Sequence, residues 1–270
     1  MEPCIGLTRR TLLRMIGGAL GAPLIGPLLA PIAACGGGPA PEHLTPTPRG
    51  VRELAAGPKG TGGAAEPTSA ASGVQPLGLS RGERDGVLVL PDRAGPVPLI
   101  LMLHGAGGTG RRAVRLLGPA APLGCAIVAP DARGQTWDAV MGKFGPDVRF
   151  IERALAEAGT RCSLDGRYAV AGFSDGATYA LALGRANGDR FSHILAFSPG
   201  FLIQTHRLGT PRIYISHGRQ DAVLPIASCS RVIVPQLEHD GYDVLYREFE
   251  GAHEAPPTVV REGIGRFLGA

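Results

Sequence analysis

Short apolar runs alternate with longer amphipathic segments over residues 76–270. The apolar runs are four to six residues long and rich in aliphatic and β-branched side chains, which predicts seven strands: 86–90, 98–103, 125–129, 168–171, 193–197, 212–216 and 244–249. Several runs are apolar almost throughout, as in strands buried on both faces of a parallel sheet. Segments with helical apolar spacing are predicted helices: 147–158, 176–185, 226–239 and 257–268. The alternation predicts an α/β domain, with a mostly parallel central sheet flanked by helices.

The first 35 residues have a different pattern. Arg9 and Arg10 precede a moderately apolar stretch, 15–34, that contains seven glycine and proline residues. So many helix breakers disfavour a membrane-spanning helix. Basic residues followed by an apolar stretch and small residues are typical of a secretory signal, and the arginine pair indicates the twin-arginine route. Residues 1–35 are therefore a predicted twin-arginine signal peptide.

The signal ends in Ile32-Ala33-Ala34-Cys35, which resembles a bacterial lipobox. This predicts lipidation of Cys35 and an exported lipoprotein held on a membrane surface of the cell envelope. The alternative is ordinary cleavage nearby, which would give a periplasmic or secreted protein. Residues 36–75 are mostly Gly, Pro, Ala, Thr and Ser, so we expect a disordered tether before a single domain at 76–270.

Charge and cysteine content argue against other classes of protein. The net charge is +4, aromatic residues make up 5% of the chain, and there is no block of Lys and Arg, so a nucleic-acid partner is not expected. Beyond the export segment remain Cys125, Cys162 and Cys229, an odd number without C-x-x-C spacing. This disfavours a disulfide framework or zinc site, although one pair could form in an oxidising compartment. We expect neither metal nor cofactor.

The segment LHGAGGTG, 103–110, follows the predicted strand 98–103 and has three interpretations. A phosphate-binding P-loop would need Lys and then Ser or Thr where this chain has Arg111 and Arg112, so that interpretation fails. A dinucleotide loop fits the G-x-G-x-x-G spacing, and Asp131 follows the next strand at about the distance of a ribose-binding acid. The third interpretation is the oxyanion loop of a serine hydrolase. This segment alone does not choose between the last two.

A second motif, Gly172-Phe173-Ser174-Asp175-Gly176, lies between a predicted strand and a predicted helix. It matches the nucleophile elbow G-x-S-x-G. Glycine is needed two residues before and after the serine because a side chain there would strike the neighbouring strand or helix. The turn lifts the Ser174 hydroxyl clear of the sheet, which makes Ser174 the predicted nucleophile.

A serine nucleophile needs a base, and the base needs an acid to orient it. On the fold that carries this elbow the chain order is Ser, Asp or Glu, then His, each after a later strand. Asp221 follows the strand 212–216, and His253 follows the strand 244–249. We therefore predict that His253 takes the proton of Ser174 and that Asp221 holds the imidazole in the correct tautomer.

Other acids and histidines suit these roles less well. Asp240 and Asp243 are rivals for the acid, but they flank a helix end and a strand start, at the wrong end of the sheet. His239 is interpreted as a solvated helix residue. His193 and His217 lie beside strand ends and are interpreted as structural histidines.

The triad gives LHGAGGTG a role as the oxyanion loop. The predicted donors are the backbone N–H groups of Ala106 and of Asp175, the residue after the nucleophile. The neighbouring glycines let the backbone curl toward the substrate oxygen. His104 is predicted to brace this loop rather than act as a base. The Asp175 carboxylate starts a helix, where it complements the dipole and needs no catalytic role.

These motifs resemble one known family. The segments LMLHGAGG, APDARGQTWD, GPDVRFIERAL, GFSDGA, FSPGF, SHGRQDAVLP and GYDVLYREFEGAHE are similar to the phospholipase/carboxylesterase branch of the α/β-hydrolases, which includes acyl-protein thioesterase-like enzymes and is similar to polyester-depolymerase and feruloyl-esterase relatives. The resemblance runs from Leu77 to Leu268. It implies an α/β-hydrolase fold and carboxylic-ester hydrolysis through an acyl-enzyme, with Ser174, Asp221 and His253 on the triad positions and no metal.

The connection 199–210 is too short for a cap domain, which predicts an open, shallow site for short acyl chains or for esters on larger molecules. Trp137 and Phe144, in the loop 134–145, are candidates for the wall of the substrate pocket; packing on the sheet edge is the alternative interpretation.

The leading hypothesis is a lid-less serine esterase, and a peptidase or thioesterase would use the same triad. Two alternatives come from other classes: an exported nucleotide-dependent oxidoreductase, and a catalytically idle, lipid-tethered binding protein on the hydrolase fold. The sequence does not indicate the acyl group, the alcohol or the oligomeric state.

Overall fold

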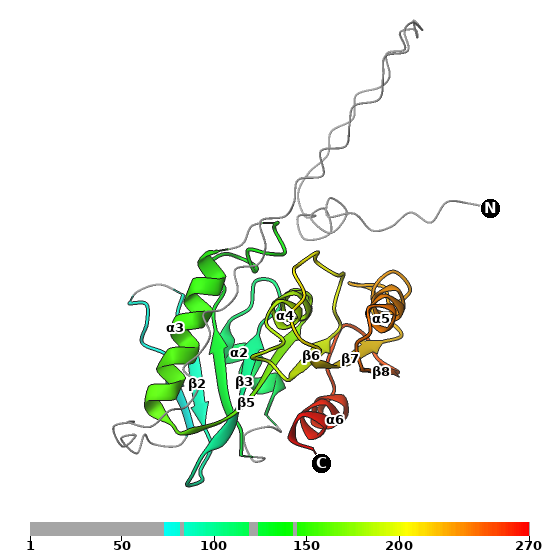
Figure 1. The fold of residues 1–270 in the computed structure, drawn as a ribbon. Helices are drawn as coiled ribbons and strands as arrows, with labels where there is room; N and C mark the ends of the chain where they lie inside the picture. Colours follow the sequence, from blue (N-terminus) through cyan, green and yellow to red (C-terminus); the bar gives the residue numbers. More distant parts are fainter. Residues whose placement is uncertain (1–72, 82–83, 119–123, 143–144, 270) are drawn as a thin grey trace, which may run out of the picture. The chain divides into compact units, whose positions relative to one another are not determined.

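A computed structural model describes residues 73–81, 84–118, 124–142 and 145–269 of the chain. Its centre is an eight-stranded sheet in the order β1-β2-β4-β3-β5-β6-β7-β8 (Figure 1). The strands are β1 Gly73–Pro76, β2 Gly86–Leu90, β3 Val97–Leu103, β4 Ala126–Pro130, β5 Leu164–Phe173, β6 His193–Phe197, β7 Arg212–Gly218 and β8 Val244–Phe249. From β4 to β8 the pairing is parallel, whereas β1 and β2 pair antiparallel at one edge. The prediction of a mostly parallel sheet is confirmed.

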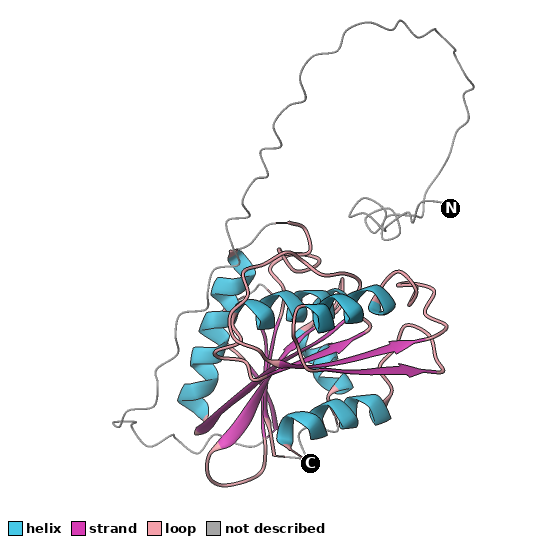
Figure 2. Ribbon diagram, turned by 45° about the vertical axis from the view of Figure 1, so that its right-hand side comes forward, coloured by secondary structure: helices cyan, strands magenta, loops and turns pink. Residues whose placement is uncertain are grey.

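Helices cover both faces of this sheet (Figure 2). They are α2 Gly110–Leu116, α3 Pro146–Arg161, α4 Asp175–Ala186, α5 Ser230–His239 and α6 Pro257–Leu268. The helices α3, α4 and α5 lie on one face, and α2 and α6 lie on the other (Figure 1). Seven of the eight strands and four of the five helices in the described residues correspond to elements that the sequence predicts.

Strand β3 shows why the central strands are apolar at consecutive positions. Leu99 and Leu101 face the core beneath α3 and α4, while Ile100 and Met102 face the core beneath α2 and α6. All four side chains are fully buried. Each such burial contributes about 1.5–3 kcal/mol, so a polar residue anywhere in this run would cost stability.

The structure differs from the sequence prediction at two elements. Strand β1 begins at Gly73, three residues inside the predicted tether, and its sequence GVQP alternates half-buried and exposed residues instead of forming an apolar run. Helix α2 was not predicted because its seven residues include three arginines and bury only Gly110 and Ala113. It is started by Thr109, whose Oγ1 accepts a hydrogen bond from the Arg112 amide at 3.3 Å.

Two boundaries also move. Strand β5 starts four residues before the predicted 168. Its first half is mostly polar and exposed, so no apolar run marks it in the sequence. Helix α5 begins at Ser230 instead of 226, because a separate turn, in which Pro225 O accepts from the Ser228 and Cys229 amides, occupies the start of the predicted helix. The start of β5 lies at the amino end of its strand, whereas the start of α5 lies beside the loop after β7, where Ser230 Oγ is 2.7 Å from His217 Nδ1.

The predicted signal peptide, the lipidation residue Cys35 and the predicted tether up to residue 72 lie outside the described residues. Across the described ranges, no helix is long and apolar enough to cross a membrane. Cys125, Cys162 and Cys229 all carry free thiols.

Candidate active site

The nucleophile elbow connects β5 to α4. Ser174 has φ 56° and ψ −121°, a backbone conformation that is strained for a residue with a side chain. A Cβ on Gly172 would lie 2.1 Å from Gly176 O, and a Cβ on Gly176 would lie 2.2 Å from Leu103 O. Helix and strand backbones therefore leave room only for glycine at both positions, as the motif predicts. The strained serine sits at the carboxyl end of a central strand, where its side chain is offered to the loops around it.

Three loops bring Ser174, His253 and Asp221 together. The Ser174 Oγ lies 2.9 Å from His253 Nε2, and His253 Nδ1 lies 2.6 Å from Asp221 Oδ2. The three residues come directly after β5, β8 and β7, which end at the same edge of the parallel sheet. A neutral imidazole with its proton on Nδ1 would donate to Asp221 and leave Nε2 free to accept the serine proton.

His253 is held by more than its carboxylate. Its ring lies 4.8 Å from the ring of Phe173, the residue before the nucleophile. The side chain of His253 is 15% exposed, whereas that of Asp221 is fully buried. The imidazole therefore reaches the open site while the acid behind it stays dry, which strengthens the interaction between the two.

The buried Asp221 carboxylate has several donors. Its Oδ1 accepts from the Val223 and Leu224 amides at 2.9 and 2.8 Å. On the other oxygen, His217 Nε2 lies 3.2 Å from Oδ2 and 2.8 Å from the Leu224 carbonyl. Burial lowers the pKa of His217, so the ring is neutral, with its proton on Nε2 and Nδ1 accepting from Ser230 Oγ at 2.7 Å. The predicted structural histidine is also a neighbour of the triad acid, a contact that its sequence position did not show.

The loop after β3 lies against the nucleophile. A Cβ on Gly105 would be 3.2 Å from Ser174 Cβ. The loop is closed by hydrogen bonds from the Gly108 amide to Gly105 O, 3.0 Å, and from the Gly107 amide to Gln135 O, 2.7 Å. Within the described part of the chain, the amides of Ala106 and Asp175 donate to no acceptor. Two free donors beside the serine are what an oxyanion hole requires.

His104 braces this loop as predicted. Its Nε2 accepts from the Ala132 amide at 2.9 Å, so its proton is on Nδ1, which donates to Gly105 O at 2.7 Å. Burial lowers the pKa of His104, which keeps the ring neutral. Arg84 joins the same arrangement by donating to Gly108 O at 2.6 Å and to Ala132 O at 2.6 Å. Arg84 carries no motif, so its role in this loop is not visible in the sequence.

The Asp175 side chain is hydrogen-bonded outside the triad. Its Oδ2 accepts from Thr136 Oγ1 at 2.6 Å, which ties the loop after β4 to the elbow. Burial raises the pKa of this carboxyl, while the Thr136 hydrogen bond opposes the shift. The side chain thus has a structural partner, in keeping with the absence of a catalytic role.

The prediction that Trp137 lines the substrate pocket is wrong. Trp137 has no exposed surface, and its Nε1 donates to His104 O at 2.8 Å. Its ring is stacked on Tyr179 at 5.3 Å. The indole is apolar enough to fill the core beneath the oxyanion loop, and its single polar atom finds a backbone acceptor there. Phe144, the other candidate for the pocket wall, lies outside the described residues.

The rival acids and histidines lie elsewhere. Asp243 sits at the start of β8 and pairs with Arg266 at 2.7 Å, at the opposite end of the strands from Asp221. His239 and Asp240 end α5. His193 starts β6, with its ring 5.4 Å from Phe267. None of them reaches Ser174, because amino and carboxyl ends of parallel strands are a full strand length apart.

The dinucleotide interpretation also lacks its binding geometry. Asp131, its candidate ribose ligand, accepts from the Gly110 amide through Oδ1 at 2.6 Å. The carboxylate thereby occupies the N-terminus of α2, where a pyrophosphate would have to bind. The glycines of this loop serve the turn beside Ser174 instead.

The fold and the site define an open α/β sheet with a nucleophile elbow. No protein-family model matches the sequence, and no curated protein is significantly similar to it. Several solved structures are similar to this chain. Esterase PE8 matches it at 19% identity and a TM-score of 0.57, over 69% of this chain and 99% of that one. An S-formylglutathione hydrolase from Staphylococcus aureus matches at 13% identity and a TM-score of 0.58, over 76% and 100%. A phospholipase/carboxylesterase from Dyadobacter fermentans matches at 22% and 0.52, over 69% and 98%.

These structures are of an esterase, an S-formylglutathione hydrolase and a phospholipase/carboxylesterase, and this chain shares their α/β-hydrolase fold. At such identities the likeness concerns the fold, so the chemistry has to be argued from the residues of the site.

Proposed function

We propose that the protein is a serine hydrolase that cleaves carboxylic esters through an acyl-enzyme. The observation that carries the proposal is the continuous chain from Ser174 Oγ through His253 to Asp221, with distances of 2.9 and 2.6 Å. An aligned nucleophile, base and acid on a strained elbow serve no evident packing purpose. They are the groups that acyl transfer needs.

The proposed reaction has two halves. His253 Nε2 takes the proton as Ser174 Oγ attacks the ester carbonyl, and the amides of Ala106 and Asp175 stabilise the oxyanion. The protonated His253 then gives its proton to the leaving alcohol, which leaves an acyl group on Ser174. In the second half His253 deprotonates a water that attacks this acyl group, and Ser174 recovers its proton. Asp221 stabilises the imidazolium formed in both halves.

The site is proposed to accept short acyl groups or esters on larger molecules. The chain between β6 and β7, residues 198–211, contains neither helix nor strand. No cap therefore rises from this connection, and an uncovered site encloses less of an acyl chain. A thioester presents a similar carbonyl to the same residues, so both substrate classes belong in the test.

The test is hydrolysis of a p-nitrophenyl ester series from acetate to palmitate, with thioesters of the same chain lengths. In Ser174→Ala and His253→Ala we expect kcat to fall roughly 10⁴- to 10⁶-fold, because each variant removes a member of a unit that acts together. Wild-type rates in both variants would contradict the proposal and favour an idle binding protein. The preferred chain length would report the depth of the acyl pocket.

We also propose that the protein is exported and anchored by lipid at Cys35, on the strength of the twin-arginine and lipobox sequences. In cells fed a labelled fatty acid, the wild-type protein is expected to carry the label and to sediment with membranes. Cys35→Ala should lose both properties, whereas Cys4→Ala, the matched control within the signal, should keep them. Equal labelling of Cys35→Ala and wild type would contradict the anchor.

A further inference from the structure

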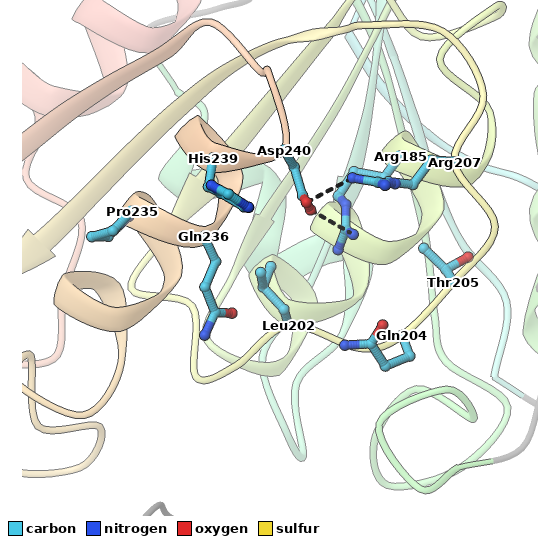
Figure 3. Close-up of a pocket in the computed structure, with 9 residues that line it drawn as sticks. All are labelled: Arg185, Leu202, Gln204, Thr205, Arg207, Pro235, Gln236, His239 and Asp240. Atoms are coloured by element: carbon cyan, nitrogen blue, oxygen red, sulfur yellow. Dashed lines mark ion pairs between the residues drawn. The ribbon is translucent and has the colours of Figure 1, made fainter. Parts of the chain in front are cut away.

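A cavity separate from the active site lies between the C-terminal ends of α4 and α5 (Figure 3). Its volume is about 580 Å³, and the chain between β6 and β7 forms its third side. Arg185 in its wall lies near the end of α4, whereas Ser174 precedes the start of that helix. At 1.5 Å rise per residue the two are about 16 Å apart along the helix axis. No triad residue lines the cavity.

Two arginines converge on one carboxylate in this cavity. Arg207 Nη1 lies 2.7 Å from Asp240 Oδ1, and Arg185 Nη2 lies 3.7 Å from Asp240 Oδ2 (Figure 3). The second distance is beyond hydrogen-bond range, so Arg185 forms an ion pair with Asp240 but no hydrogen bond with it. With two positive groups and one negative group, the three side chains leave an excess of one positive charge.

The cavity also gathers buried polar atoms that lack partners. Arg185 is 4% exposed, and its Nε and Nη1 have no hydrogen-bond partner within the described ranges. Thr205 Oγ1, in the chain between β6 and β7, has none either. Seven buried side-chain atoms lack a hydrogen-bond partner in the described part of the chain, and three of them belong to residues that line this one cavity. Leaving a buried guanidinium short of acceptors is costly, which indicates a ligand that brings them.

We propose that this cavity binds the phosphate group of a phosphate ester. A phosphate has several terminal oxygens in a tetrahedral arrangement, so it can accept from Arg185 and Arg207 together, which a second planar carboxylate does less well. Its negative charge would neutralise the excess positive charge of Arg185 and Arg207 over Asp240. The side-chain amides of Gln204 and Gln236 line the rest of the cavity and suit hydroxyl or carbonyl groups of the organic part. The volume exceeds that of inorganic phosphate and fits a small metabolite or a lipid headgroup.

The first experiment measures binding to the full chain. Thermal unfolding and titration calorimetry would be carried out with inorganic phosphate and glycerol 3-phosphate, against sodium chloride of equal ionic strength and glycerol. We expect both phosphates to raise the unfolding temperature above the chloride control, with glycerol 3-phosphate the tighter ligand. No effect beyond that of chloride would overturn the proposal.

Variants with opposite expected effects make the test specific. Arg207→Gln removes the positive excess and should weaken phosphate binding roughly tenfold to a hundredfold. Asp240→Asn removes the competing carboxylate and should tighten it severalfold. Arg231→Gln is the matched control, because Arg231 is as exposed as Arg207, 49% for each side chain, but pairs with Glu248 outside the cavity. Equal affinity in wild type, Arg207→Gln and Asp240→Asn would overturn the site even if some phosphate binds elsewhere.

A third arm separates the two sources of the phosphate ester. Sedimentation with vesicles of neutral lipid, or of neutral lipid with phosphatidylglycerol, would be compared between wild type and Arg207→Gln. Loss of binding to the anionic vesicles in this variant would identify a lipid headgroup, whereas binding of glycerol 3-phosphate alone would identify a soluble ester. Ester hydrolysis is measured alongside and should be unchanged in all three variants. Failure of the phosphate site would therefore leave the proposed esterase activity intact, and failure of the esterase activity would leave the phosphate site intact.

Discussion

At the scale of the residue, Asp221 shows how a buried carboxylate is held in place by its partners. Two backbone amides serve one oxygen, and His253 and His217 approach the other. Because each carboxylate oxygen has two polar neighbours, the carboxylate stays in one orientation. It can therefore hold the His253 ring with its basic nitrogen toward Ser174. Asp240 and Asp243 have arginine partners instead.

This difference predicts the outcome of two matched substitutions. Asp221→Asn should reduce kcat about 10⁴-fold with a small change in KM, because an amide cannot orient the imidazole or stabilise its cation. Asp243→Asn, at the opposite end of the strands, should keep kcat within about twofold. Steady-state kinetics on a p-nitrophenyl ester measure both; similar losses in the two variants would mean that the acid has been assigned wrongly.

At the scale of the element, the elbow depends on two glycines in contact with backbone. The oxygen of Leu103, at the end of β3, closes off the position that a side chain on Gly176 would need. Gly159, in the exposed part of α3, has no atom within 4 Å of its Cβ position. Packing requires glycine at position 176, whereas nothing in the packing requires it at position 159.

Alanine at these positions should therefore act in opposite directions. Gly176→Ala is expected to destabilise the protein by about 1–3 kcal/mol and to lower activity, because the helix has to move away from β3. Gly159→Ala should stabilise it by about 0.5–1 kcal/mol, because alanine restricts the unfolded chain and favours helix. Urea unfolding measures the free energy of unfolding of both variants. A Gly176→Ala protein as stable as wild type would contradict the close contact between the elbow and β3.

At the scale of the whole molecule, two buried histidines and the half-buried His193 link folding to pH. Burial lowers the pKa of His104, His193 and His217 below the usual 6.5. For His193 the pKa falls to about 4, helped by the neighbouring charges of Arg212 and Arg266. The folded protein therefore keeps these rings neutral at a pH where the unfolded chain binds protons.

The consequence is a loss of stability on acidification. The stability that the neutral histidines contribute is fully present above pH 6.5, the pKa of a histidine in the unfolded chain. It is lost as the pH falls toward the lowered pKa values of the folded protein, which reach about 4 for His193. His193 should account for about 1–3 kcal/mol of this loss, with allowance for its partial exposure. His193→Gln should flatten the dependence of the unfolding temperature on pH between these limits, whereas the exposed His206→Gln should not. A parallel slope in His193→Gln and wild type would contradict the assignment.

The sequence by itself determined the central strands, the helical layers and the positions of Ser174, Asp221 and His253. It could do so because burial on both faces imposes continuous apolar runs, and because the elbow and the chain order of the triad leave local marks. The edge strand β1 and the short helix α2 have no such mark, since both remain half exposed.

Only the tertiary structure decided which residues meet. The contact of His217 with the triad acid, the brace of Arg84 on the oxyanion loop and the burial of Trp137 all join residues that are distant in sequence. The same holds for Arg185 and Thr205, which look like ordinary residues of a helix and a loop until the fold places both beside one cavity, with Arg185 Nε and Nη1 and Thr205 Oγ1 lacking hydrogen-bond partners. Periodicity records which face of an element is buried, but not what lies opposite it, and that is settled only when the elements pack.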